Sequence, residues 1–410
     1  MLRKLRLGGR VGLRNLARNR RRTAIGVATI GFGVIALLLA GGFIEWIFWA
    51  MRVATIESRL GHIQIVRQGY LGEGVKDPYD YLMPERPAWL ESVRAMPDVK
   101  AITPRLAFNG LISFGDNTVA YLGEGVVPEN EAVVSRWMVV TEGEGLSSEK
   151  ADQIILGRGL AENLGASPGD RVVLLANTAG GGINAIEVRV GGLFTSATKA
   201  FDDAALRVPI GVAHRLLRIE GVHRWVILLH DTARTDRVLG ALRERLSREG
   251  LELVPWYELA DFYNKTVALF SRQVNVVQLI IGIIIVLAIS NTLVMSVLER
   301  TGEIGTLLAL GFRRGTILMF FVMEGAVLGV VGTLVGAVLG MFLAVVISQV
   351  GIPMPPPPGS DTGFTGEIHL TFPLVSSTVI LALTTSFVAS LYPAWKASRM
   401  QAVDALRHNR

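Results

Sequence analysis

Four stretches of this chain are long enough and apolar enough to cross a lipid bilayer. A spanning helix needs about 20 mostly apolar residues. Residues 23–50, 274–298, 317–350 and 370–395 meet this requirement, and none of them holds more than one charged residue. Hydrophobic residues make up 50% of the chain and charged residues 19%, which is more apolar than an ordinary soluble protein. We therefore predict an α-helical membrane protein with four transmembrane helices.

Basic residues beside these stretches predict the orientation of the chain. Cytoplasmic loops carry an excess of Lys and Arg. Residues 1–22, predicted to be a basic amphipathic segment, hold nine basic residues and no acidic one. The loop 299–316 and the tail 396–410 are also basic, whereas the loop 351–369, which includes Pro355–Pro358, has no Lys or Arg. We expect both termini in the cytoplasm and residues 51–270 on the opposite side. The first apolar run is too long for a cleaved signal peptide, and no small-x-small site follows it.

Residues 51–270 have the composition of a soluble α+β domain. Strands are predicted from alternation at 62–66, 100–123, 170–175, 187–190 and 225–230, and helices from apolar spacing at 87–96 and 234–250. The order is strand, helix and strand, then a β-rich stretch at about 117–208, then helix, strand, helix and strand. This order predicts one α/β unit interrupted by a β-rich insertion.

The second apolar stretch lies in a longer segment that favours helix. Residues 257–303 contain no Pro, and their only glycines are Gly282 and Gly302. At 1.5 Å per residue, an unbroken helix here would be on the order of 65 Å long. The first span can also extend past the bilayer. Periodicity leaves two interpretations open: a mechanical link between the two sides of the membrane, or a tilted span with a short extension.

Several catalytic and metal-binding classes have no counterpart in the sequence. The chain has no Cys, which excludes disulfides, thiolate metal sites and Cys nucleophiles. It contains no phosphate-binding P-loop, and its six His residues are scattered without ligand spacing. Membrane topology explains the net charge of +6, so nucleic acid is not indicated. We expect no catalytic residue, metal or cofactor in this chain.

Three segments carry a resemblance to a known family. Residues 288–312 read AISNTLVMSVLERTGEIGTLLALGF, residues 392–409 read YPAWKASRMQAVDALRHN, and residues 13–23 read LRNLARNRRRT. With four spans and a large domain between the first two, the chain resembles the FtsX-like permeases of ABC transporters, the group that includes MacB, LolC and LolE. The resemblance covers essentially the whole chain, and the stand-alone layout is most similar to LolC and LolE.

The resemblance implies a mechanotransmitting permease subunit in the bacterial inner membrane. It implies a dimer with a second copy or a paralogue, and a dimeric cytoplasmic ATPase that binds ATP and Mg²⁺. The loop after the second span would form the ATPase-coupling helix. Its residues here are Glu299, Arg300, Thr301, Gly302, Glu303, Ile304 and Gly305.

Two departures from the family pattern predict a less electrostatic ATPase contact. Position 302 is often Arg in relatives and is Gly here, and Leu307 and Leu308 replace a pair that usually includes a basic residue. From the residues alone, Glu299, Arg300 and Glu303 fit either a contact with a partner or a solvated, positive-inside loop.

Three of the polar residues inside the predicted spans are candidates for a specific role. Ionisable groups are costly there. Glu324 lies about two turns into the third span, where a structural contact with Ser, Asn or a cation is favoured over a proton relay. Glu45 lies near the external end of the first span, and solvation is favoured over a role in substrate entry. Asn291 is expected to donate a hydrogen bond across helices.

A stripe of glycines follows one face of the third span. Small residues at this spacing let two helix backbones approach closely. We expect packing within the subunit, on the fourth span, in preference to a dimer interface. The residues are Gly325, Gly329, Gly332, Gly336 and Gly340.

The leading functional hypothesis is a permease driven by a separate ATPase that extrudes or releases a lipoprotein, lipid or other hydrophobic substrate. Membrane lipid and a periplasmic adaptor or lipoprotein are then the further partners. One alternative is an FtsX-like signalling scaffold that regulates a cell-wall hydrolase. A second alternative is a membrane-anchored enzyme, for which the sequence offers no candidate residue.

Overall fold

The computed structural model describes residues 20–74, 77–150, 152–196, 198–247, 249–354 and 364–400. Most of the basic N-terminal segment, the prolines at 355–358 and the tail from residue 401 lie outside these ranges. The chain forms two compact units. The helical unit contains the chain up to Trp49, Val267–Pro353 and the chain from Thr365, and the α+β domain contains Ala50–Thr266.

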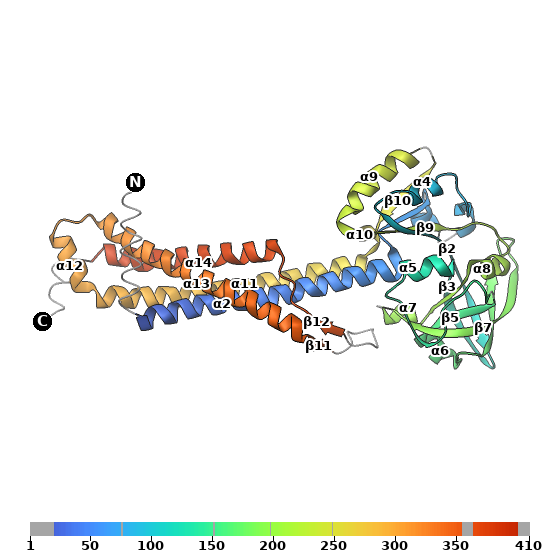
Figure 1. The fold of residues 1–410 in the computed structure, drawn as a ribbon, viewed down its shortest axis with the longest axis horizontal. Helices are drawn as coiled ribbons and strands as arrows, with labels where there is room; N and C mark the ends of the chain where they lie inside the picture. Colours follow the sequence, from blue (N-terminus) through green and yellow to red (C-terminus); the bar gives the residue numbers. More distant parts are fainter. Residues whose placement is uncertain are drawn as a thin grey trace. The chain divides into compact units, whose positions relative to one another are not determined.

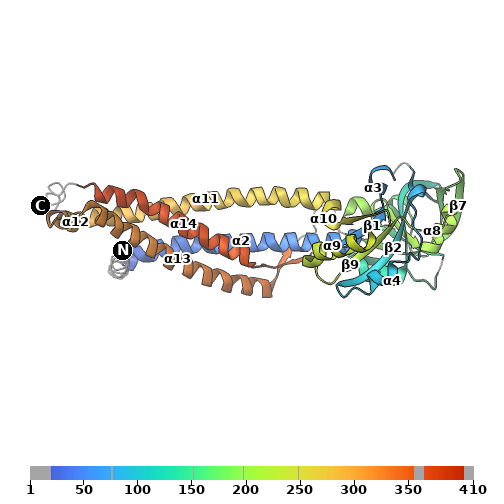
Figure 2. The ribbon, with the colours of Figure 1, turned by 90° about the horizontal axis from the view of Figure 1, so that it is seen from above.

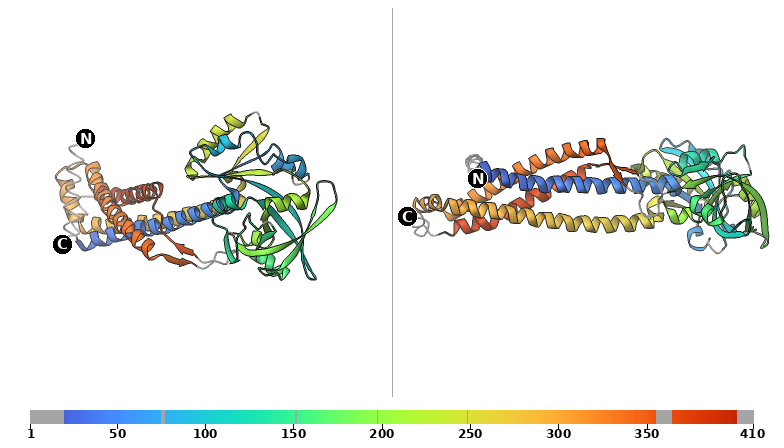
Figure 3. Two further views of the ribbon diagram at one scale, coloured as in Figure 1. Left: turned by 45° about the vertical axis from the view of Figure 1, so that its right-hand side comes forward. Right: turned by 90° about the horizontal axis from the view of Figure 1, so that it is seen from below.

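Four long apolar helices form the helical unit, which confirms the predicted fold class (Figure 1). They are α2 (Arg20–Thr55), α11 (Asp261–Glu299), α13 (Arg314–Val350) and α14 (Phe372–Ser398). Each of them is long enough and apolar enough to span a membrane. All four contribute to one buried core, in which Ile30, Ile289, Leu328 and Ala382 are almost fully covered. The short helix α12 (Thr301–Ala309) turns between α11 and α13 (Figure 3).

The glycine stripe of α13 packs against two helices. A Cβ atom at Gly325 or Gly329 would lie 2.5 Å from the Cβ of Ser390 or Ser386 on α14. Gly332, Gly336 and Gly340 instead face α2, where they approach Ile30, Gly31 and Leu38. The sequence predicts packing on the fourth span alone. The earlier glycines of α13 therefore contact α14 and the later ones contact α2. Figure 2 shows these three helices in one bundle.

We expect Gly336→Ala to destabilise the helical unit by about 1–3 kcal/mol, as overpacking does. The new Cβ would lie 2.7 Å from the carbonyl oxygen of Gly31, and a backbone atom cannot move aside without separating α2 from α13. Thermal unfolding of the detergent-solubilised chain measures the effect. The matched control is Gly315→Ala on the same helix, where no atom lies within 4 Å of the added Cβ. Equal unfolding temperatures for the two variants would contradict the packing argument.

One half of the α+β domain is a sheet covered by two helices. In the described chain, ten strands form one sheet, and its first four in spatial order are β10 (Leu251–Pro255), β1 (Ile63–Arg67), β9 (Arg224–Leu229) and β2 (Val99–Phe114). These strands run antiparallel to their neighbours. Side chains from α4 (Leu90–Arg94) and α9 (Thr235–Leu246) pack on them, with Val93, Trp225, Ile227 and Leu242 at the centre. This half is the α/β unit that the sequence predicts.

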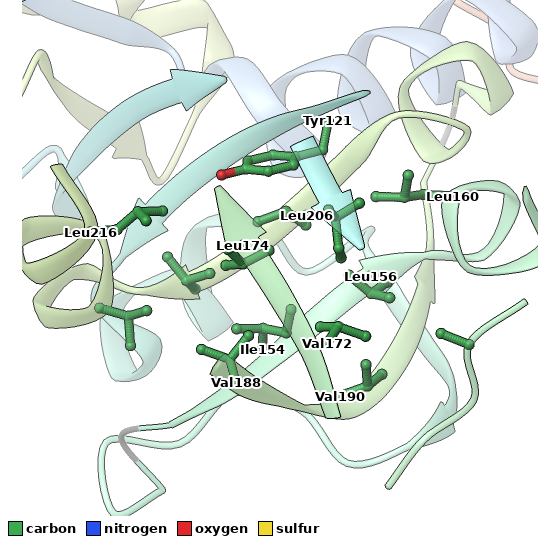
Figure 4. Packing of buried hydrophobic residues seen from close by; sticks show 14 of the residues in the cluster. Tyr121, Ile154, Leu156, Leu160, Val172, Leu174, Val188, Val190, Leu206 and Leu216 are labelled. Atoms are coloured by element: carbon green, nitrogen blue, oxygen red, sulfur yellow. The ribbon is translucent and has the colours of Figure 1, made fainter. Parts of the chain in front are cut away.

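The other half is the β-rich insertion. From β2 the sheet continues through β3 (Asn117–Val126), β8 (Ala205–Pro209), β5 (Gln153–Gly157), β7 (Ile183–Thr195) and β4 (Val139–Gly143), while β6 (Arg171–Asn177) pairs with β2 and β7. Figure 4 shows its core, where Ile154, Leu156, Leu174 and Val190 converge. The helices are α5 (Pro128–Val134), α6 (Arg158–Leu164), α7 (Lys199–Asp202) and α8 (Ile210–Leu217).

The structure differs from the sequence-based expectation in two places. The unbroken helix considered for 257–303 is interrupted at Ala260 and Arg300, so that α11 has 39 residues and a length of about 58 Å. Helix α8, expected to belong to the α/β unit, contributes Val212 and Leu216 to the core of the insertion. Both side chains are fully buried there, so the insertion includes its closing helix.

The remaining short elements lie in the connections. They are the π-helical turn η1 (Ile56–Leu60), α3 (Tyr70–Glu73), the 3-10 turns η2 (Pro78–Tyr81) and η3 (Thr232–Arg234), α10 (Trp256–Leu259), β11 (Ile352–Met354) and β12 (Phe364–Gly366).

Two histidines in the α+β domain are buried in their neutral form. Nδ1 of His62 accepts from the backbone N–H of Leu229 at 3.0 Å, and burial lowers the pKa of His62 to about 4. Nδ1 of His223 accepts from the backbone N–H of Ala107 at 3.2 Å, and burial lowers its pKa to about 4 as well. Protonation of either ring would remove an acceptor and place a charge in the core.

We expect the domain to lose stability as the pH falls from 7 to 5. In this range the unfolded chain binds protons at both histidines, whose unfolded pKa is about 6.5, and the folded chain does not. The free energy of unfolding is at its full value above about pH 6.5. By pH 5 it has fallen by about 2 kcal/mol for each of the two histidines. Urea unfolding followed by near-ultraviolet circular dichroism measures it. His62→Gln should remove about half of the pH dependence, whereas substitution of the exposed His230 should leave it unchanged.

Candidate coupling site

The candidate site lies where α11 ends and α12 begins. Arg300 stands between the two helices with a non-helical backbone, which redirects the chain. The hydroxyl of Thr301 donates to the carbonyl of Leu298 at 2.7 Å and so satisfies a terminal carbonyl of α11. The buried face of α12 joins a core built from three of the long helices. Its members are Val297, Ile304, Ile317, Phe321, Ala394 and Ala397.

One ion-pair network ties α12 to α13. The guanidinium of Arg300 donates to Glu324 at 3.0 Å and to Glu303 at 2.9 Å. Its carbon lies 5.7 Å from the ring centroid of Phe321. The second carboxylate oxygen of Glu324 accepts from the hydroxyl of Ser296 at 3.2 Å. Arg300 therefore joins a residue of the coupling helix to a carboxylate inside the third span.

The network is largely shielded from solvent. The side chain of Glu324 is 10% exposed and that of Arg300 is 18% exposed. Removing one partner of a buried ion pair leaves an uncompensated charge, which costs about 3–5 kcal/mol. A rotation of α12 that separated Arg300 from Glu324 would carry a similar penalty. The pair therefore holds the start of α12 against α13.

The opposite side of this segment presents apolar side chains to solvent. After α12 the chain turns at Gly311, whose φ of +82° suits glycine. Leu310 is 71% exposed and Phe312 is 43% exposed, and the exposed Arg313 and Arg314 follow directly. We call Leu310, Phe312, Arg313 and Arg314 the turn patch. Aromatic and Arg side chains, which the turn patch contains, are enriched at protein–protein interfaces.

The structure places the other polar residues of the predicted site outside this network. Glu45 is half-buried on α2. Asn291 is exposed, and the interhelical hydrogen bond expected of it is made by its neighbour, since the hydroxyl of Ser290 donates to the carbonyl of Ala389 at 2.9 Å. Successive residues of a helix are about 100° apart, so α11 turns Ser290 toward α14 and Asn291 away from it.

The arrangement offers ion pairs and packing, not a reaction centre. Within the described ranges, no group of three or more His, Cys, Asp or Glu side chains could hold a metal ion. What the site contains is helix packing and one buried ion pair.

Two family models match the chain. The model described as FtsX-like permease C-terminal matches residues 275–402, which include α12 and the Arg300–Glu324 network. The model described as MacB-like periplasmic core domain matches residues 23–245, more than half of the chain.

Two LolC proteins match over most of their length, and a MacB protein matches over about a third of its length. The lipoprotein-releasing system transmembrane protein LolC of Xylella fastidiosa is 28% identical over 76% of this chain and 78% of its own. LolC of Neisseria meningitidis serogroup B is 25% identical over 97% and 98%. The macrolide export ATP-binding/permease protein MacB of Rhodopirellula baltica is 29% identical over 52% of this chain and 31% of its own.

Solved structures give weaker similarities. The periplasmic region of MacB from Actinobacillus actinomycetemcomitans covers 52% of this chain with 10% identity and a TM-score of 0.37. The extracellular domain of the transporter YknZ covers 47% with 13% identity and a TM-score of 0.35. The family assignment therefore rests on the two family models. This chain belongs to the FtsX-like permeases with a MacB-like periplasmic core domain, and is a multi-pass, non-catalytic permease subunit of an ABC transporter.

Proposed function

We propose that this chain couples ATP hydrolysis by a separate cytoplasmic ATPase to a conformational change of its α+β domain. The observation that carries the proposal is the anchoring of α12, which packs on three long helices and is tied by Arg300 to Glu324. A displacement applied to α12 would therefore reach the third span directly. ATP and Mg²⁺ belong to the partner in this proposal, and the chain itself binds neither.

The turn patch and the polar side of α12 are the proposed contact with the ATPase. Glu303 is exposed on α12, and Leu310 and Phe312 are exposed beyond its end. Thr301, Ile304 and Gly305 are buried, so they hold α12 in place and do not face a partner. The contact is then mainly apolar with a basic rim, which agrees with the missing basic residues at 302, 307 and 308.

The proposed location is the bacterial inner membrane, with both termini in the cytoplasm and the α+β domain in the periplasm. The basic loop between the second and third spans supports this orientation. A second permease copy or a paralogue completes a dimer. A reporter fused after Arg410 tests the orientation, because it is active on the cytoplasmic side only if the tail lies there.

The proposed cargo is a lipoprotein, a lipid or another hydrophobic molecule taken from the membrane, with a periplasmic adaptor or lipoprotein as a further partner. The relatives from Xylella and Neisseria are named as transmembrane proteins of a lipoprotein-releasing system, which supports this cargo class. Their identities of 28% and 25% leave the cargo itself a proposal.

Hydrogen–deuterium exchange on the reconstituted complex tests the proposed function. The full chain and its ATPase are placed in lipid nanodiscs, and exchange is compared with and without a non-hydrolysable ATP analogue. We expect nucleotide binding to change exchange in strands of the α+β domain as well as at α12. A change confined to the ATPase and α12 would refute coupling to the domain.

A further inference from the structure

Helix α2 ends inside the α+β domain in an unusual way. Its last regular residue is Thr55, and the single π-helical turn η1 follows before the chain enters β1. Gly61 ends the turn with a φ of +64°, and a Cβ atom there would lie 2.3 Å from Val226 and 2.9 Å from the carbonyl of Ile227. Isolated π-helical turns are rare and occur frequently at functional sites.

The carbonyl groups of η1 accept hydrogen bonds from the surrounding domain. Carbonyls at the end of a helix have no partner within the helix and carry its partial negative charge. The donors come from several different elements, and we call them the carbonyl socket. They are the backbone N–H of Trp137 to Glu57, the hydroxyl of Ser135 and the guanidinium of Arg207 to Ser58, the guanidinium of Arg105 to Arg59, and the side-chain amide of Gln64 to Leu60.

Buried carboxylates fix the two arginines of the socket. Arg105 pairs with Glu131 at 2.6 Å, and Arg207 pairs with Glu131 at 2.8 Å and with Glu124 at 3.0 Å. The residues Arg105 and Arg207 are 0% and 1% exposed. Burial alone would raise the pKa of Glu124, but the neighbouring guanidinium groups outweigh burial and hold this pKa well below its usual range. The pKa of Glu131 is lowered by the same guanidinium groups. Glu124 and Glu131 therefore stay charged and hold Arg105 and Arg207 in contact with the carbonyls of η1.

The socket connects η1 to both halves of the domain. Arg105 lies on β2, which belongs to the α/β unit in its first half, whereas Arg207 lies on β8 of the insertion. Ser135 follows α5, between β3 and β4. Charged groups are costly to bury, and an apolar contact would anchor a helix end more simply. Five donors on one set of backbone carbonyls instead fix the position and rotation of the helix end.

We propose that the carbonyl socket is the place where a displacement of α2 enters the α+β domain, with Arg105 and Arg207 as the positioning residues. A movement of α2 along its axis would carry the carbonyls of η1 with it. The two guanidinium groups would then pull on β2 and β8, one in each half of the domain. This inference rests on the proposed function and adds to it the residues through which the movement passes.

Arg105→Lys tests the socket. Lysine keeps the charge beside Glu131 but cannot reach the carboxylate and the carbonyl of Arg59 together, as the guanidinium does. The matched control is Arg224→Lys, because Arg224 pairs with Glu124 in the same cluster and, within the described residues, donates to no carbonyl of η1. The readout is the nucleotide-dependent exchange of β2 and β8 in the reconstituted complex.

We expect the exchange response of β2 and β8 to fall at least fivefold in Arg105→Lys and to stay within twofold of wild type in Arg224→Lys. Basal ATPase activity and the unfolding temperature without nucleotide should match between the two variants. If Arg105→Lys does not fold, Ser135→Ala combined with Gln64→Met replaces it, since this pair removes two donors without changing any charge.

Two outcomes separate the inference from the function on which it rests. If nucleotide-dependent exchange of β2 and β8 in Arg105→Lys, or in the Ser135→Ala/Gln64→Met variant, equals that of wild type, the role of the socket is refuted. The proposed function is then unaffected. The absence of any nucleotide response in the wild-type domain overturns the proposed function and the inference together.

Discussion

Replacing Arg300 with Met is expected to destabilise the helical unit by about 3–5 kcal/mol, because it leaves Glu324 buried without its cation. The double variant Arg300→Met/Glu324→Gln should recover most of this loss, since it removes both charges of the pair. Thermal unfolding in detergent measures the stability of the wild type, the single variant and the double variant. Arg272→Met, at an exposed position of α11, serves as the control and should shift stability by no more than about 0.5 kcal/mol.

The same variants separate folding from coupling. In the double variant α12 is no longer tied to α13 by charge, although the apolar contacts of Ile304 and Phe321 remain. We expect the permease-dependent stimulation of the partner ATPase to fall at least tenfold in the single and in the double variant. A double variant that folds and stimulates the ATPase like wild type would show that the ion pair serves stability alone.

Leu310→Asp combined with Phe312→Asp is expected to weaken binding of the ATPase about 100-fold. Exposed apolar anchors at the centre of an interface commonly contribute 2 kcal/mol or more, and a tenfold change in affinity corresponds to about 1.4 kcal/mol. Both side chains point away from the core of the helical unit, so folding should be unaffected. Affinity is measured by titrating the purified ATPase onto the permease in nanodiscs.

Phe372→Asp is the matched control for this prediction. Phe372 is 84% exposed at the first residue of α14, and α13 separates it in sequence from the turn patch. We expect its ATPase affinity to remain within twofold of wild type. Equal weakening by both substitutions would mean that the loss reflects general damage to the permease, and would remove the turn patch from the interface.

The spans and the halves of the domain follow from local sequence patterns. Apolar length predicts the four long helices, since only a helix satisfies its backbone groups inside a bilayer. Alternation and turn residues predict β1, β2, β3, β6, β7 and β9 as strands, whereas β4, β5 and β8 fall in a stretch predicted only as β-rich. These features depend on neighbours in sequence, so they can be predicted without knowing the packing.

The contacts of the coupling site depend on how the helices pack. The sequence therefore predicts the kind of group beside Glu324 but not the residue that supplies it. A cation or a hydroxyl was expected beside Glu324, but Ser296 and Arg300 are 28 and 24 residues away and are chosen by how α11 lies against α13. Within the described chain, Ser290 makes an interhelical hydrogen bond beside the predicted Asn291, and neighbouring residues of a helix lie on different faces.

The carbonyl socket could not be predicted from the sequence. Its acceptors are backbone carbonyls, which every residue has, and its donors come from segments between residues 64 and 207. The one local signal is Gly61 after a helical run, which is typical of a helix end. Arg105 and Arg207 were absent from the predicted site because arginines on strands usually face solvent.

Photo-crosslinking in native membranes tests the central claim most directly. A photoreactive amino acid replaces Leu310 in the turn patch, and the crosslinked products are identified after irradiation. We expect one dominant product that joins this chain to an ABC-type ATPase. A chain that crosslinks only to lipid, or to proteins that bind no nucleotide, would contradict the account.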